Sequence, residues 1–234
     1  MRLRIYEDLE VIGKAIIRDD KRFSFLAYLL HGDRNVLIDT LPDRSASMLI
    51  EALQEILGDK QLDAIITNHS EEDHSGALPE VLKVYKGVPV YGTANCQRRL
   101  GSIVPTVDFH VVHTGDTLQI GTYNFSFIET TGLHWDDNMV TFLAKQGILF
   151  SNDLFGQMAA EEPCLDREYT KEDLLTATEV YYNNVFAAAP LKQKQVLKTI
   201  ATLPIKLIAP GHGVVLQRYG HDILNYYLNQ LPKE

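Results

Sequence analysis

Two imidazoles and two carboxylates stand close together in the first third of the chain, and these side chains bind transition metals. His69, Glu71, Asp73 and His74 fall within six residues, directly after an apolar segment. Imidazole nitrogens and carboxylate oxygens together suit iron, zinc and manganese ions. The alternative is a solvated acidic turn that caps a helix beginning near Gly76. That alternative leaves unexplained why two histidines flank the alternating carboxylates, so the segment predicts a metal site.

Six residues cannot easily surround two metal ions, so further ligands must come from elsewhere in the chain. His134, Asp153 and His212 each follow a short apolar segment of the kind that forms a buried strand. Loops that leave the carboxyl ends of strands gather at one edge of a mixed α/β fold. A lone histidine or aspartate there is more commonly structural, but all seven residues together offer four imidazoles and three carboxylates. The four positive charges of two divalent ions are neutralised by the three carboxylates and one bridging hydroxide.

The order of these residues resembles a known family. The motif His-x-Glu-x-Asp-His, followed by His134, Asp153 and the Gly-His-Gly around His212, is similar to the diiron domain of flavodiiron proteins, the oxygen and nitric oxide reductases of anaerobic microbes. The likeness covers nearly the whole chain and includes Trp135 and the stretch 149–156. It implies an α/β fold of the metallo-β-lactamase type, a four-layer αβ/βα sandwich with two central β-sheets flanked by helices.

The resemblance also implies a cofactor and a ligand set. The cofactor is two iron ions joined by an oxo or hydroxo bridge, and the carboxylate of Asp153 bridges the ions across about 3.5–4 Å. The remaining six residues divide into one set for each iron: His69, Glu71 and His134 for the first, and Asp73, His74 and His212 for the second.

The residue at position 71 bears on the choice of metal. Zinc hydrolases of this fold typically carry His-x-His-x-Asp-His, so they have an imidazole where this chain has Glu71. A carboxylate there makes the site harder and more anionic, which stabilises the oxidised state of an ion that cycles between Fe(II) and Fe(III). Glu71 therefore favours iron. A binuclear metallohydrolase that activates water against an ester or thioester is the alternative function.

Electron supply separates two functions for an iron pair. Flavodiiron proteins usually continue into a flavodoxin domain, but no strand here is followed by the Ser/Thr/Gly-rich loop that cradles a flavin phosphate, so we expect no FMN. Two Fe(II) ions give two electrons, whereas reduction of dioxygen to water needs four. We therefore expect a protein that binds dioxygen, and nitric oxide as a second ligand, for sensing. The alternative is an oxygen or nitric oxide reductase fed by a separate flavoprotein or rubredoxin.

Two aromatic residues are expected beside the irons. Phe25 lies where the family often has a polar side chain, and loss of a proton donor there slows cleavage of bound oxygen. Trp135 directly follows the candidate ligand His134. Trp135 is expected, with Met158, to form a wall of the pocket. The alternative for Phe25 is a plain core residue on a buried strand.

The elements that must position these residues appear as hydrophobic patterns. Apolar runs predict strands over residues 9–17, 23–30, 35–39, 62–67, 123–128, 147–151 and 205–209. Helical spacing predicts helices over 45–57, where Gly58 provides a stop, and over 171–188, 191–203 and 217–231. No low-complexity linker or block of charge interrupts the pattern, so residues 1–234 are expected to form one domain.

Composition narrows the choice of partners. The net charge is −9, from 22 basic and 31 acidic side chains, whereas nucleic acids and anionic membranes bind basic surfaces. No apolar run reaches the ~18 residues of a membrane span and the N-terminus lacks a signal peptide, so we expect a cytoplasmic protein. Cys96 and Cys164 belong to no CxxC pair and are expected as reduced thiols. The expected partners are dioxygen or nitric oxide, a redox or signalling protein and, by resemblance, a second chain in a homodimer.

Overall fold

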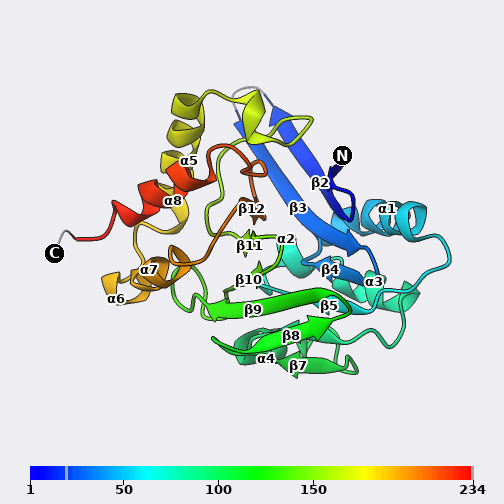
Figure 1. Ribbon diagram of the computed structural model, residues 1–234. Coiled ribbons are helices and arrows are strands. Elements are labelled where there is room, and N and C mark those ends of the chain that lie inside the picture. Colours follow the sequence, from blue (N-terminus) through cyan, green and yellow to red (C-terminus); the bar gives the residue numbers. More distant parts are fainter. Residues whose placement is uncertain (19–20, 233–234) are drawn as a thin grey trace.

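The N-terminal half of the chain forms a mixed β-sheet. The structure is a computed structural model that describes residues 1–18 and 21–232. In this described part the sheet has seven strands in the order β1 to β7 (Figure 1). Strands β1 to β4 pair antiparallel, and β4 to β7 pair parallel. The strands are β1 (Arg2–Tyr6), β2 (Leu9–Arg18), β3 (Lys21–His31), β4 (Asn35–Ile38), β5 (Ala64–Ile66), β6 (Val90–Gly92) and β7 (Phe109–Val111).

A second sheet follows in the C-terminal half. Among the described residues it has five strands in the order β12-β11-β10-β9-β8. All its pairs are antiparallel except β11 with β12, which are parallel. The carboxyl ends of β11 and β12 therefore lie at the same edge of the sheet. The strands are β8 (Thr117–Ile120), β9 (Tyr123–Glu129), β10 (Met139–Leu143), β11 (Ile148–Asn152) and β12 (Leu207–Pro210).

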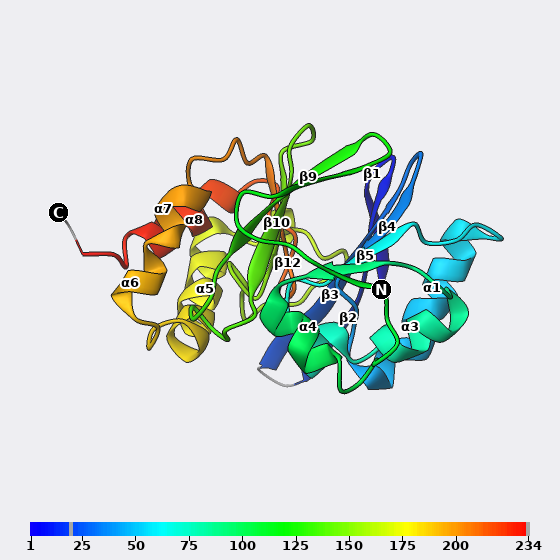
Figure 2. The same cartoon turned by 90° about the horizontal axis from the view of Figure 1, so that it is seen from below.

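Helices cover the outer faces of the two sheets. Figures 1 and 2 show α1 and α3 on one side of the molecule, α5, α7 and α8 on the opposite side, and the strands between them. This is the four-layer αβ/βα arrangement that the motif implied, so the predicted fold class is confirmed. The helices are α1 (Ala46–Leu57), α2 (Glu72–Ser75), α3 (Leu78–Val84), α4 (Ala94–Leu100), α5 (Lys171–Val185), α6 (Leu191–Lys194), α7 (Val196–Ile200) and α8 (Gly220–Leu228), with 3-10 turns at Asp43–Ser45 and Asp166–Glu168.

The burial of side chains explains why these segments form these elements. Helix α1 buries Leu49, Leu53 and Leu57, which recur every four residues and so line one face of the helix. Strand β5 is buried at every position, because one face contacts the second sheet and the other contacts helices. Two hydrophobic clusters result, one around both sheets with α5 and α8, the other under α1 and α3.

The two sheets are joined by hydrogen bonds near the candidate ligands. The amide of Leu26 on β3 donates to Gly211 O at 2.9 Å, and the hydroxyl of Tyr28 donates to Pro210 O at 2.7 Å. The amide of Met139 on β10 donates to Asn68 O at 3.0 Å. These bonds fix the ends of β5 and β12 relative to each other, which is the geometry that a site shared by the two sheets requires.

Several predicted helices are shorter in the structure. The helix expected over 171–188 ends at Val185, ahead of Pro190, and the one expected over 191–203 is split into α6 and α7. Helix α8 begins at Gly220 rather than at 217, because Leu216 pairs with Ile208 on β12 and the amides of Arg218 and Tyr219 bond to Asp166 in the turn that follows. The strand expected over 62–67 covers only Ala64–Ile66. Apart from the split into α6 and α7, these are differences at element ends, and the types of the predicted elements are correct.

Two further expectations concern membranes and thiols. Within the described residues, no helix combines the length and the apolar character that crossing a membrane demands. Cys96 and Cys164 are both free and buried, as the prediction of two thiols requires.

Candidate metal centre

The four clustered candidate ligands lie on the connection between β5 and α3. The carboxylate of Asp39, at the end of β4, accepts hydrogen bonds from the amide of Asn68 at 2.7 Å and from its side chain at 3.0 Å. It also accepts one from the side chain of Asn152 at 3.2 Å. Asp39 therefore ties the ends of β4, β5 and β11 together. The short helical turn α2 then places Asp73 and His74 beyond β5.

The three distant candidate ligands reach the same place from the second sheet. Asp153 directly follows β11, His212 follows β12, and His134 lies in the loop between β9 and β10. A Cβ atom on Gly211 would lie 2.6 Å from Cε1 of His74, so glycine is needed for the close approach of the two segments. The structure thus brings together all the predicted ligands, which are His69, Glu71, Asp73, His74, His134, Asp153 and His212.

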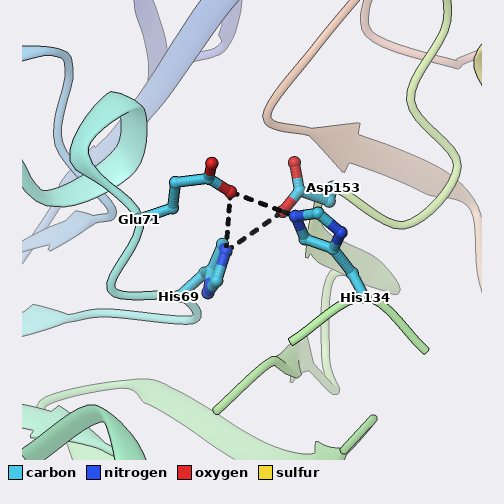
Figure 3. A group of neighbouring side chains, drawn as sticks. All are labelled: His69, Glu71, His134 and Asp153. Atoms are coloured by element: carbon cyan, nitrogen blue, oxygen red, sulfur yellow. Dashed lines mark hydrogen bonds and ion pairs between the residues drawn. The ribbon is translucent and has the colours of Figure 1, made fainter. Parts of the chain in front are cut away.

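The first group of ligand atoms comes from His69, Glu71, His134 and Asp153 (Figure 3). Glu71 Oε2 lies 3.2 Å from His69 Nε2 and 3.0 Å from His134 Nε2. Asp153 Oδ2 lies 3.6 Å from His69 Nε2 and 3.9 Å from His134 Nε2. Figure 3 shows that the four side chains point toward one another from separate segments of the chain. Two nitrogens and two oxygens therefore surround one point.

The second group comes from Asp73, His74 and His212. His74 Nε2 and His212 Nε2 face each other at 3.0 Å. Asp73 places Oδ1 3.6 Å from His74 Nε2 and Oδ2 3.4 Å from His212 Nε2. Two imidazole nitrogens at this separation repel each other through their lone pairs unless a cation or a proton lies between them. The donor set of this group therefore fits a metal ion.

Asp153 lies between the two groups and faces both. Its Oδ2 atom is directed toward the first group, as described above, whereas its Oδ1 atom lies 3.2 Å from His74 Nε2 and 3.1 Å from His212 Nε2. The residue is buried, with 3% of its surface exposed. Each group therefore receives one oxygen of the same carboxylate. This is the arrangement by which a carboxylate bridges a pair of ions.

In the metal-free protein this cluster retains protons. Burial opposes the charged form of His69, but its bonds to Asp137 and Glu71 raise its pKa to about 10. Bonds from His134 and His69 lower the pKa of Glu71 to about 2. Burial also opposes the charged form of His212, but two neighbouring carboxylates raise its pKa to about 10. A metal cation supplies the same positive charge as these protons, so metal binding must release them.

Two hydrogen bonds on the far side of the imidazoles orient them toward the site. Asp137 is buried, and its Oδ1 atom lies 3.1 Å from His69 Nδ1 while Oδ2 accepts the amide of Ser70 at 2.8 Å. Nδ1 of His212 donates to the carbonyl of Ser24 at 2.8 Å. With Nδ1 bonded in this way, the lone pair of Nε2 is free for a metal ion.

Asp137, Ser24 and Tyr181 were not predicted as site residues. The hydroxyl of Tyr181 on α5 is buried and donates to Asp153 Oδ1 at 3.2 Å. Asp137 could have been suspected, because a carboxylate three residues after His134 is close enough to reach the site. No spacing pattern marks Ser24 or Tyr181, because each contacts a residue far away in the sequence.

Aromatic rings surround the ligand histidines. The ring of Phe23 stacks on His212 with centroids 4.4 Å apart, and Phe25 meets His212 edge-on at 5.6 Å. The ring of Trp135 meets His69 edge-on at 5.0 Å. Phe25 and Trp135 therefore lie beside ligands, as expected, and Phe23 joins them. That Trp135 forms a wall of a gas pocket stays a prediction.

Comparison with known proteins assigns the family. The sequence matches the family model described as "ODP family beta lactamase" over residues 23–213. The chain belongs to this family. The anaerobic nitric oxide reductase flavorubredoxin of Klebsiella pneumoniae is 36% identical over 210 residues, which are 88% of this chain and 44% of that protein. The flavorubredoxin of Aeromonas salmonicida is 35% identical over 216 residues, 89% of this chain and 41% of that protein. The chain thus spans less than half the length of these curated relatives.

Solved structures of flavodiiron proteins share the fold of this family member. A mutant of the flavo-diiron protein from Thermotoga maritima is 32% identical, with a TM-score of 0.88 over 97% of this chain and 61% of that one. Rubredoxin oxygen:oxidoreductase from Desulfovibrio gigas has a TM-score of 0.87 over 98% of this chain and 61% of that one, and at 24% identity it supports the fold alone. The predicted relation to flavodiiron proteins is confirmed.

Proposed function

We propose that this chain is the diiron part of a nitric oxide or oxygen reductase. The observation that carries the proposal is the position of Asp153, which directs one carboxylate oxygen at each of two groups of histidine and carboxylate ligands. Such a carboxylate suits two ions held side by side. The curated relatives named above are nitric oxide reductases, and their names favour reduction over both the hydrolase alternative and oxygen sensing.

The ligand assignment is part of the proposal. Two Fe(II) ions, when bound, supply electrons to the gas, and Glu71 supports iron over zinc because it adds negative charge to the site. Asp153 would be shared by the two ions, and the remaining residues would hold them in one set each: His69, Glu71 and His134 for one, and Asp73, His74 and His212 for the other.

Other residues of the chain have supporting roles in the proposed reaction. The hydroxyl of Tyr181 bonds to Asp153 Oδ1 at 3.2 Å, and burial raises its pKa well above the ordinary value of a phenol. Its proposed role is to give a proton to a strongly basic oxygen, since reduction of either gas consumes protons. Asp137 and the carbonyl of Ser24 hold two imidazoles with Nε2 toward the ions. The ring of Phe23 covers His212 and limits its contact with water. We further propose that the chain acts as one domain and receives its electrons from another redox centre.

Oxygen binding without reduction is the second candidate function. The observation that favours it is the pair of apolar rings, Phe23 and Phe25, that pack on His212, because apolar side chains donate no proton to bound oxygen. Tyr181 provides a donor from another direction, at Asp153. Together with the names of the relatives, this donor makes reduction the stronger candidate.

Turnover with an external reductant tests the proposal. Protein loaded anaerobically with Fe(II) is mixed with nitric oxide or dioxygen in the presence of excess chemical reductant, and gas consumption is followed with an electrode. We expect many gas molecules consumed per iron pair, and loss of this turnover in Asp153→Asn. Asp59→Asn, the same change at an exposed position, is the matched control. Uptake that stops at one dioxygen molecule, or at two nitric oxide molecules, per iron pair would overturn reduction and support binding. Failure to bind iron would overturn both.

A further inference from the structure

The loop of residues 130–138 carries the ligand His134 although it is neither helix nor strand. Inside the loop, the amide of Thr130 donates to Asn138 O at 2.8 Å, and the amide of Trp135 donates to the side chain of Asn138 at 2.8 Å. These bonds shape the loop but do not set its distance from the other ligands. The position of His134 therefore depends on contacts that the loop makes with the rest of the molecule.

Helix α4 and the residue that caps it supply several of these contacts. The side chain of Asn95 donates to the carbonyl of Asp136 at 2.9 Å, and the guanidinium of Arg99 bonds to the Asp136 carboxylate at 2.7 Å. The hydroxyl of Thr93, the N-cap of α4, donates to the carbonyl of Asp137 at 3.0 Å. The loop is thus held to α4 through its backbone and through one side chain.

Arg99 makes a second kind of contact with the loop. Its guanidinium carbon lies 4.9 Å from the centre of the Trp135 ring, within the range of a cation–π interaction. Its Nε atom lies 3.8 Å from Asp137 Oδ1. Trp135 and Asp137 in turn contact His69, as described above. Arg99 therefore touches both residues that connect the loop to the first group of ligands.

We infer that Arg99 and Asn95 are positioning residues for His134, and that they set the affinity of the first ligand group for its iron ion. Arg99 is not a ligand, because its side chain lies outside the cluster and is 39% exposed. Arginine suits this role because a planar guanidinium can bond a carboxylate and stack on an indole at the same time, which an ammonium cannot. The inference rests on the proposed iron site but not on the proposed reaction.

The chain provides its own optical probe for the test. It contains one tryptophan, Trp135, so its intrinsic fluorescence reports on this loop. In Arg99→Gln we expect emission at longer wavelength and stronger quenching by acrylamide, because the ring loses its cover. In anaerobic titration with Fe(II) against a chelator, we expect one of two ions to bind about tenfold more weakly, as is typical when a residue behind a ligand is lost. The other ion should lose less affinity, since Asp73, His74 and His212 lie outside the loop and only the shared carboxylate of Asp153 contacts it, through Asn138.

Three variants complete the experiment. Arg99→Lys keeps the charge but not the stacking, so we expect an intermediate affinity. Asn95→Ala removes the bond to the loop backbone together with a bond that Asn95 accepts from Arg98 on the same helix, and it should weaken binding of the same ion. Arg167→Gln is the control for lost charge, because Arg167 is exposed in a distant 3-10 turn and pairs with its neighbour Glu168. It should behave like the wild type in both assays.

The outcomes separate this inference from the proposed function. Unchanged emission and unchanged affinities in Arg99→Gln would overturn the positioning role while leaving the iron site intact. If Arg99→Gln bound both ions more weakly by the same factor and had a lower melting temperature, the protein would be generally destabilised. That result would also overturn the positioning role. Wild-type protein that binds fewer than two ions would overturn the iron site and this inference together. Two bound ions without gas reduction would overturn the proposed reaction alone.

Discussion

Asp137→Asn tests whether the orientation of His69 matters for metal binding. Asp137 is fully buried, and each of its two oxygens has one hydrogen-bond partner, His69 Nδ1 at 3.1 Å and the amide of Ser70 at 2.8 Å, while Arg99 Nε forms an ion pair with Oδ1 at 3.8 Å. Asparagine has nearly the same shape but offers one acceptor oxygen and one NH2 group. One of the two partners must then face a donor, and the negative charge behind the imidazole is lost.

The magnitude follows from these contacts. A buried hydrogen bond that is replaced by an unsatisfied group costs about 1–3 kcal/mol, so the metal-free protein should lose about that much free energy of unfolding. Loss of the partner behind a ligand histidine lowers metal affinity by roughly 10–100-fold. We therefore expect both a lower denaturation midpoint and weaker binding of the ion that His69 holds.

Two measurements check this prediction. Denaturant unfolding of the metal-free protein gives the stability change, and Fe(II) titration against a chelator gives the affinity. Asp59→Asn again serves as the control, because it makes the same substitution at an exposed position. If Asp137→Asn lost stability but bound both ions as tightly as the wild type, Asp137 would be a structural residue only, and the orienting role given to it here would be refuted.

Three other changes have expected outcomes. Gly211→Ala places a Cβ atom 2.6 Å from Cε1 of His74, so elemental analysis should find one iron per chain instead of two; two would contradict the close approach. Tyr181→Phe removes the donor to Asp153, so nitric oxide turnover should fall at least tenfold at unchanged iron content; equal turnover would exclude Tyr181 as a proton donor. In the metal-free protein, burial lowers the pKa of His212, but neighbouring carboxylates raise it to about 10. Iron must displace this proton, so the affinity for iron should rise with pH up to that value, and calorimetry in two buffers should detect the released proton. An affinity independent of pH would contradict this.

The sequence was enough to predict which candidate ligands lie together, because their types and places are local features. One short motif contains His69, Glu71, Asp73 and His74. The other three residues follow apolar strands, and these strands end at the same edge of the second sheet. The residues that support the ligands could not be predicted in this way. Tyr181 contacts Asp153 across 28 residues and Ser24 contacts His212 across 188, and neither belongs to a pattern of spacing.

The fold shows the same division between local and distant information. Hydrophobic periodicity predicted α1 and the long strands, because burial on one face repeats along the element. It failed at element ends that distant residues determine. Leu216 pairs with Ile208 on β12 in an antiparallel bridge, which keeps the backbone extended just before α8 and delays its start. The division of the strands into two sheets came from the family resemblance and not from periodicity.

The division of the ligands between the two sheets has a consequence for how the protein matures. The cluster from His69 to His74 extends from the first sheet, whereas His134, Asp153 and His212 extend from the second. Each ion of the proposed pair would therefore need donors from both halves of the polypeptide, because neither half offers both of the sets. A nascent chain would gain high affinity for iron only once its halves have docked, so iron incorporation would report correct assembly. The ions of the proposed site would then act as cross-links that resist separation of the halves.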